Sequence, residues 1–211
     1  MLLAQLYPNV RIDAIINPDN GPGTSVDPNY VNGTGELQKA GITVIGYVYT
    51  SYGARPTSSV LSDIKDYKTW YNVSGIFLDE MSDNPSTAEY YSNLTSTTHS
   101  LGVHLVIGNP GTNVSKSLIE SVDNIVVYET SGLPSVSTIC GSTFGLPRNT
   151  ISMIVDNEKA MPSASYLRSI SSCAGFVYFT NQPENSNTYN VLPSYIGLEV
   201  SEVASLNKTS G

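Results

Sequence analysis

The sequence predicts a (β/α)8 TIM-type barrel that lacks its first β-strand. Apolar runs of strand length recur every 21 to 31 residues or so, with helical stretches between them, as in βα units of a parallel sheet. Acidic or amide residues end one run after another. The 211 residues are expected to form one barrel domain, residues 1–211. An open doubly wound sheet is the alternative, but its frequent G-x-G-x-x-G turn is missing from the sequence.

Seven apolar runs are expected to form the strands. Residues 1–7 precede the first of them and resemble the tail of a helix. The organising run is at residues 73–81, where an apolar stretch typical of a strand buried on both faces ends in two adjacent carboxylates. The expected strands cover residues 11–17, 42–50, 73–81, 103–108, 124–129, 150–156 and 175–180.

Four helices are expected between and after these strands. The first spans residues 30–40 and ends before a glycine suited to the position after a helix. The second, residues 59–71, carries Val60, Ile64, Tyr67 and Tyr71 at helical spacing. The third spans residues 85–100, with a proline in its first turn, and the last spans residues 192–206.

Composition excludes several classes of function. The chain has 18 Asp and Glu residues against 10 Lys and Arg, and its net charge of −8 would repel nucleic acid. It has no apolar run near the roughly 18 residues of a membrane span. The acidic residues lie on separate strands without histidine or cysteine nearby, so we expect no metal and no cofactor. A G-x-S-x-G elbow is missing, which disfavours a serine hydrolase. We expect a monomer.

Several features favour a secreted or cell-surface protein. Glycosylation sequons begin at Asn32, Asn72, Asn93, Asn113 and Asn207, although a chain rich in Ser, Thr and Asn acquires some by chance. Outside the cell, Cys140 and Cys173 would form one disulfide; the alternative is two buried thiols. Residues 1–7 lack the basic start and cleavage site of a signal peptide, so secretion would require an N-terminal segment that precedes them.

Polar residues at the ends of the expected strands are the candidates for chemistry. In a barrel the carboxyl ends of all strands meet on one rim, where enzymes of this fold carry their active sites. Carboxyl groups from alternate strands can approach to about 5–5.5 Å, as in a retaining glycosidase. The strand-end residues are Asn17, Asp79 with Glu80, Asn109, Glu129 and Asp156.

Each signal has a simpler interpretation. Asp79 and Glu80 could end a strand and cap the next helix, where acids are favoured. Because neighbouring strand residues point to opposite faces, only one of the two is expected to face the pocket directly. Glu129 alone could be a solvated loop acid. Tyrosines near the expected rim could stack on sugar rings or could simply pack within strands. They are Tyr47, Tyr49, Tyr52, Tyr128 and Tyr178. The prediction of an active site rests on the occurrence of acidic or amide residues at the ends of several successive strands.

Five segments, in this order along the chain, carry a resemblance to a known family: residues 15–23 (IINPDNGPG), 46–56 (GYVYTSYGARP), 75–80 (GIFLDE), 109–112 (NPGT) and 126–129 (VVYE). They resemble spherulation-specific family 4, the spherulin-4-like cell-surface proteins, which also form glycoside hydrolase family 135. The resemblance implies a (β/α)8 barrel, a secreted or cell-surface location, and hydrolysis of polysaccharide that contains α-1,4-linked N-acetylgalactosamine, of the galactosaminogalactan type. One departure is that family members begin with an additional strand and helix, so this chain is expected to be N-terminally truncated, with two exposed strand edges.

Carried over by motif, the family's acidic cluster corresponds to Asp79, Glu80 and Glu129. We expect Asp79 to act as nucleophile, Glu129 as general acid/base and Glu80 as a supporting carboxylate. Asn17, Tyr47, Arg55 and Asn109 become candidates for sugar contacts. Two alternatives remain: a non-catalytic cell-wall or spore-coat protein that binds glycan in the same cleft, and a hydrolase for another amino-sugar or galactose polymer.

Overall fold

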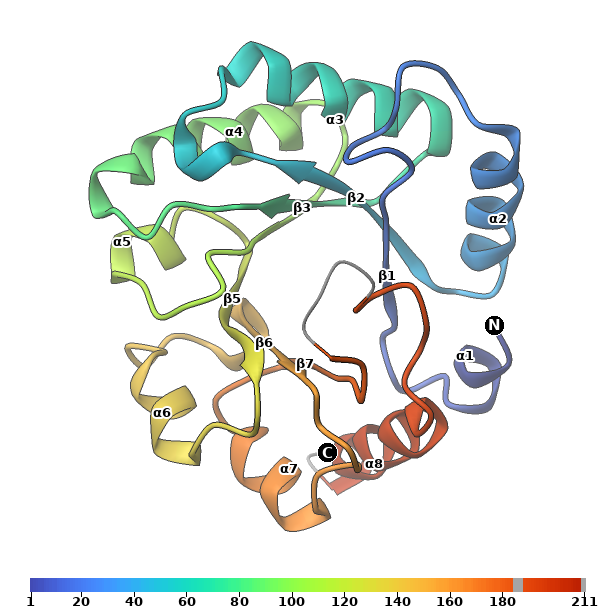
Figure 1. Ribbon diagram of the computed structural model, residues 1–211, viewed down its shortest axis with the longest axis vertical. Helices are drawn as coiled ribbons and strands as arrows, with labels where there is room; N and C mark the ends of the chain where they lie inside the picture. Colours follow the sequence, from blue (N-terminus) through green and yellow to red (C-terminus); the bar gives the residue numbers. More distant parts are fainter. Residues whose placement is uncertain (184–187, 210–211) are drawn as a thin grey trace.

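Seven parallel strands form one curled sheet with helices around its outside (Figure 1). This computed structural model describes residues 1–183 and 188–209. The strands follow one another in sequence order across the sheet, from β1 to β7, so each crossover connects neighbours. The expected barrel-type fold is confirmed. The strands are β1 Asp13–Ile16, β2 Thr43–Tyr49, β3 Gly75–Asp79, β4 Leu105–Gly108, β5 Asn124–Ser131, β6 Ile151–Asp156 and β7 Phe176–Phe179.

The four expected helices are present, and the structure adds three short ones. The last helix begins at Ile196 rather than at residue 192. The short helices α5, α6 and α7 contain four to seven residues, too few for a clear apolar periodicity. The α-helices are α1 Leu2–Leu6, α2 Pro28–Lys39, α3 Thr57–Tyr71, α4 Ala88–Ser100, α5 Lys116–Ile119, α6 Val136–Gly141, α7 Ala164–Ile170 and α8 Ile196–Thr209, with 3-10 turns at Ser51–Gly53, Pro85–Thr87 and Arg148–Thr150.

Alternate strand residues point outward to the helices and inward to the barrel interior. Both faces of the sheet carry apolar residues, because both are covered. On the outside, α3 lies close to β2, where a Cβ on Gly46 would come within 2.6 Å of the Tyr67 ring. The Tyr67 hydroxyl donates to the carbonyl of Ile16, 3.2 Å away. The inner cluster is formed by Ile45, Phe77, Ile107 and Val126.

The ring is open between β1 and β7, which are the two edge strands of the sheet. Ile15 on β1 is 46% exposed, although its register partner Ile45 is fully buried. Across the opening, the Arg11 guanidinium lies 5.3 Å from the centre of the Phe176 ring at the start of β7. The described chain therefore has the seven-stranded arrangement that the sequence predicts.

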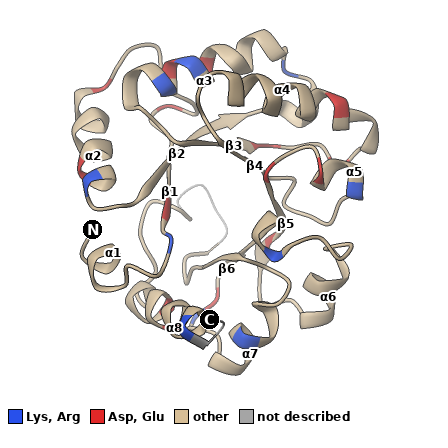
Figure 2. Cartoon of the chain, turned by 180° about the vertical axis from the view of Figure 1, so that it is seen from behind, with Lys and Arg blue, Asp and Glu red and all other residues tan. Residues whose placement is uncertain are grey.

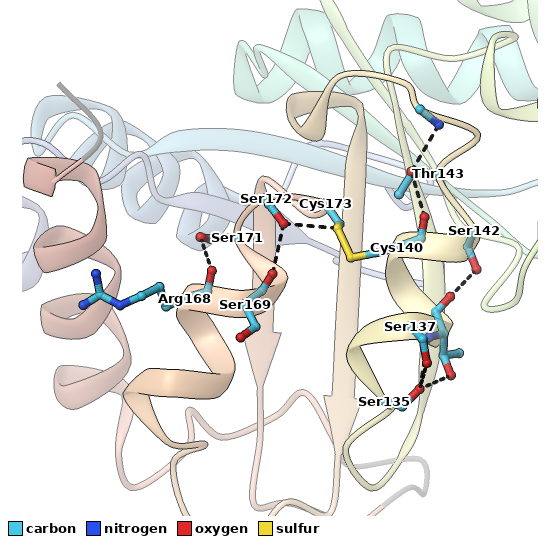
Figure 3. The surroundings of a disulfide bond; sticks show 12 residues. Ser135, Ser137, Cys140, Ser142, Thr143, Arg168, Ser169, Ser171, Ser172 and Cys173 are labelled. Carbon is cyan, nitrogen blue, oxygen red and sulfur yellow. Dashed lines mark hydrogen bonds between the residues drawn. A yellow bond between two sulfur atoms is a disulfide. The ribbon is translucent and has the colours of Figure 1, made fainter.

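A disulfide joins Cys140 at the end of α6 to Cys173 just after α7 (Figure 3). Their Cα atoms lie 5.1 Å apart, and the bond closes a loop across 33 positions of sequence. Of the two alternatives for these residues, the structure thus has the bonded pair. The bond ties together two short helices that bury few residues of their own, Ile139 on α6 and Leu167 with Ile170 on α7.

Charged residues are sparse, and Lys and Arg are scattered rather than gathered into a basic face (Figure 2). Within residues 1–183 and 188–209, no helix has both the length and the apolar character needed to cross a membrane.

Candidate active site

Three polar side chains meet at the carboxyl ends of three neighbouring strands. Asp79 is the last residue of β3, Asn109 directly follows β4, and Glu129 lies within β5. Asp79 follows Phe77 on the inward-facing side of its strand, and Asn109 follows Ile107 in the same way. All three are directed to the same mouth of the barrel, where this fold places its chemistry.

Asn109 connects the two acids directly. Its Nδ2 donates to Asp79 Oδ1 at 2.9 Å and to Glu129 Oε2 at 2.5 Å. Its Oδ1 accepts from the backbone N–H of Gly111 at 3.0 Å, which fixes the orientation of the amide. Asn109 is 5% exposed, and both its amide nitrogen and its amide oxygen have hydrogen-bond partners, as buried polar groups usually do. The residue expected as a sugar contact is placed between the two carboxylates.

A register shift in β5 directs Glu129 inward. Val126 pairs with Ser152 and Glu129 pairs with Ile154, so β5 has one more residue than β6 between the two pairings. Val126 belongs to the inner cluster and Val127 to the outer core. Strict alternation from Val126 would turn Glu129 outward. The extra residue reverses this and re-aims the side chain, as bulges next to active sites commonly do.

Tyr47 supports Asp79 from the neighbouring strand. Its hydroxyl donates to Asp79 Oδ2 at 2.7 Å, and its ring stacks on Phe77 with centroids 6.5 Å apart. Burial raises the pKa of Tyr47 far above its usual range, and the hydrogen bond to Asp79 and the nearby charges of Asp79, Glu80 and Glu129 raise it further. At neutral pH the Tyr47 hydroxyl therefore keeps its proton and donates it to the hydrogen bond with Asp79.

Glu80 lies beside this group with its backbone in the left-handed region, at φ 49°. Its carbonyl accepts from the Tyr52 N–H at 2.7 Å and from Thr50 Oγ1 at 2.8 Å, which holds the unusual turn. The negative charge of the Glu80 carboxylate is among the causes that raise the pKa of Tyr47. With the residues that the structure describes, that carboxylate forms no hydrogen bond or ion pair.

Two other expected site residues are engaged in holding loops. Asn17 Oδ1 accepts from the Gly21 N–H at 2.9 Å and shapes the loop after β1. Arg55 forms an ion pair with Asp63 at 2.7 Å, donates to the Tyr49 carbonyl and lies 4.2 Å from the Tyr49 ring centre. Sugar contacts from these two residues remain predictions.

Tyr189, which lies in the segment between β7 and α8, completes the group and was missed by sequence reasoning. Its hydroxyl donates to Glu129 Oε1 and lies 3.4 Å from Asp156 Oδ1 at the end of β6. Asp156, one of the strand-end acids, is 3% exposed. The Asp156 position could be found from the strand ends, but nothing in the sequence around Tyr189 indicates that it reaches the rim.

The arrangement suits chemistry that needs two carboxylates side by side. One Asp79 oxygen and one Glu129 oxygen both bind the same nitrogen, so their separation cannot exceed the sum of the two bonds. This bound on the two nearest oxygens is compatible with the about 5–5.5 Å between the carboxyl groups of a retaining glycosidase, and it is shorter than the about 6.5–9.5 Å between those of an inverting enzyme. In the described part of the chain, no three His, Cys, Asp or Glu side chains are grouped to hold a metal ion.

Solved structures share this fold. Sph3 from Aspergillus clavatus, solved in complex with GalNAc, superposes with a TM-score of 0.84 over 96% of this chain and 89% of that one, at 23% identity. The chitinase RmChi1 from Rhizomucor miehei superposes with a TM-score of 0.56 over 95% of this chain and 94% of that one, at 12% identity. At these identities the likeness shows the barrel-type fold.

Sequence comparison identifies the family. Spherulin-4 from Physarum polycephalum is 34% identical over 216 aligned positions, which cover 94% of this chain. The chain thus spans 64% of the length of that relative. The model of spherulation-specific family 4 matches residues 2–203. The chain described here is therefore a member of spherulation-specific family 4.

Proposed function

We propose that this protein is a retaining glycosidase for polysaccharide that contains α-1,4-linked N-acetylgalactosamine. The observation that carries the proposal is the Asn109 amide, which donates to Asp79 and to Glu129 and so brings one oxygen of each carboxylate close together, an arrangement compatible with a retaining mechanism. Support for the sugar comes from the shared fold with Sph3, whose structure contains GalNAc. The chitinase on the same fold also acts on a sugar polymer, as its name states.

The residues take the following roles in this proposal. Asp79 attacks the anomeric carbon while Glu129 gives its proton to the departing glycosidic oxygen, which breaks the bond and leaves a glycosyl ester on Asp79. Glu129 then removes a proton from water, which attacks the anomeric carbon and releases Asp79 as a carboxylate. Glu80, which directly follows Asp79, is the supporting carboxylate beside the pair. Tyr47 and Asn109 orient Asp79.

We further propose that the protein works outside the cell or at its surface. The Cys140–Cys173 disulfide supports this, because such bonds persist in oxidising compartments. The glycosylation sequons and the extracellular polymer expected as substrate agree with it.

The test is release of reducing ends from galactosaminogalactan and, in parallel, from other amino-sugar polymers. Glu129→Gln should lower kcat by about 10²–10⁴-fold, the usual contribution of a general acid. Asp79→Asn should abolish turnover, since the ester cannot form. Glu120→Gln, at the residue that follows α5, removes a carboxylate elsewhere, on a side chain that is 53% exposed, and should leave the rate unchanged. Release that persists in both site variants would remove this pair from the mechanism.

A non-catalytic glycan-binding protein is the second candidate. Both oxygens of Asp79 and both of Glu129 already accept hydrogen bonds from protein groups, an arrangement that also suits a binding cleft. Binding of the polymer by wild-type protein without any release, measured by co-sedimentation, would favour this candidate over the glycosidase.

A further inference from the structure

Tyr189 reaches the rim from outside the sheet. It lies between β7 and α8, and its ring lies 6.4 Å from that of Tyr178 on β7. The residue is 55% exposed, yet its hydroxyl end is turned toward Glu129 and Asp156. A tyrosine with an exposed ring and a hydrogen-bonded hydroxyl can contact a ligand with the ring and hold a catalytic group with the hydroxyl.

Glu129 is held from two sides. Asn109 binds Oε2 from β4, and the Tyr189 hydroxyl binds Oε1 from the far side. A carboxylate with one donor on each oxygen cannot rotate about its terminal bond without losing both. Without Tyr189, the part of the chain that the structure describes offers Glu129 a single side-chain donor, Asn109.

Asp156 restricts where the hydroxyl can go. It is almost fully buried below the rim and lies 3.4 Å from the Tyr189 hydroxyl. One hydroxyl proton serves one carboxylate at a time, and the shorter contact assigns it to Glu129. Burial and the charges of Glu129 and Asp156 raise the pKa of Tyr189 far above its usual range, so the phenol keeps this proton.

We propose that Tyr189 is a positioning residue for Glu129: its hydroxyl holds the acid/base carboxylate in the orientation that protonates the glycosidic oxygen. The inference rests on the proposed glycosidase function. The charged groups that contacts place at this pair are Asp156 from β6, which lies beside the Tyr189 hydroxyl, and Asp79 from β3, which shares the Asn109 amide with Glu129. Tyr189 does not touch the reacting atoms in this role and acts through Glu129.

The test compares wild type with Tyr189→Phe and with Tyr7→Phe, which removes a hydroxyl before β1 at the opposite end of the strands. With galactosaminogalactan as substrate, Tyr189→Phe should lower kcat by about 10²-fold, the cost of a misplaced catalytic group, while KM changes less than threefold. The limb of the pH–rate profile that reports Glu129 should move to higher pH, because the ionised carboxylate loses a donor. Tyr7→Phe should match wild type in rate and profile.

A second measurement is independent of turnover. In protein with ¹³C-labelled glutamate carboxyls, the Glu129 signal, assigned with Glu129→Gln, should shift its titration midpoint in Tyr189→Phe and remain at the wild-type midpoint in Tyr7→Phe. A rate, profile and midpoint that are all unchanged in Tyr189→Phe would overturn the inference. If wild type releases no sugar, the glycosidase proposal fails, and the carboxyl titration alone decides whether Tyr189 positions Glu129.

Discussion

Asp79 and Glu129, on strands separated by β4, share one hydrogen-bond donor. The Nδ2 of Asn109 lies 2.9 Å from the first carboxylate and 2.5 Å from the second. Two negative groups at this distance repel each other, and a donor between them offsets that repulsion. The pair is thus bridged by an uncharged side chain.

The spacing of this pair predicts the stereochemistry of the product. If Asp79 forms a glycosyl ester that water then opens, two inversions occur at the anomeric carbon and its configuration is retained. Proton NMR of the first sugars released from an α-linked oligosaccharide should show the α-anomer before mutarotation. An initial β-anomer would mean that water attacks directly, and the role of Asp79 as nucleophile would be wrong.

Removal of the shared donor should lower activity without unfolding the protein. In Asn109→Ala, the backbone bonds from Met81 and to Leu78 are kept, but the carboxylates lose their common partner. We expect kcat to fall about 10²-fold, because a displaced catalytic group costs roughly that much. Steady-state kinetics and thermal unfolding measure the two effects separately. Asn93→Ala, an exposed change on α4, is the control, and equal kcat in the two variants would contradict the bridging role.

Glu199 on α8 predicts a stability that depends on pH. It is 4% exposed, its Oε1 accepts from the Phe179 N–H at 3.1 Å, and its Oε2 has no partner among the described residues. Burial raises the pKa of Glu199 from 4.5 to about 8, against the hydrogen bond from Phe179, which lowers it. Between these two pH values the folded state keeps a proton that the unfolded state releases.

The free energy of unfolding should therefore fall as pH rises from 4.5 toward about 8. One pKa unit corresponds to about 1.4 kcal/mol, so the effect is measurable by urea unfolding. Glu199→Gln keeps the acceptor oxygen but cannot ionise, and it should flatten this part of the curve. Glu202→Gln on the same helix should leave the slope as in wild type. Parallel curves for wild type and Glu199→Gln would show that Glu199 does not retain the proton.

The disulfide predicts a loss of stability on reduction. Replacement of Cys140 and Cys173 by serine frees a loop that spans 33 positions in the unfolded chain. The free energy of unfolding should fall by about 2–4 kcal/mol. Wild-type protein treated with a reductant should unfold at the same urea concentration as the double serine variant. A reduced protein as stable as the oxidised one would show that the bond adds nothing to the fold.

The sequence was most informative where its pattern is local and long. The seven strands and the four long helices follow from apolar runs and periodicity, and the polar residues that end the strands predicted the rim at Asp79 and Asn109. The short helices α5, α6 and α7 were missed because they contain too few residues to show a period. Arg55 was expected to face a sugar, and no local signal indicated its ion pair with Asp63.

The sequence by itself therefore determined the barrel-type sheet and the chemical type of its rim, since both depend on the alternation of residues along single strands. Tertiary structure decided how the acids are aimed. Glu129 faces inward because β5 has one extra residue against β6, and such a shift depends on how two strands pair. Tyr189 reaches Glu129 only in the folded chain, through a contact across 60 positions that no local pattern encodes.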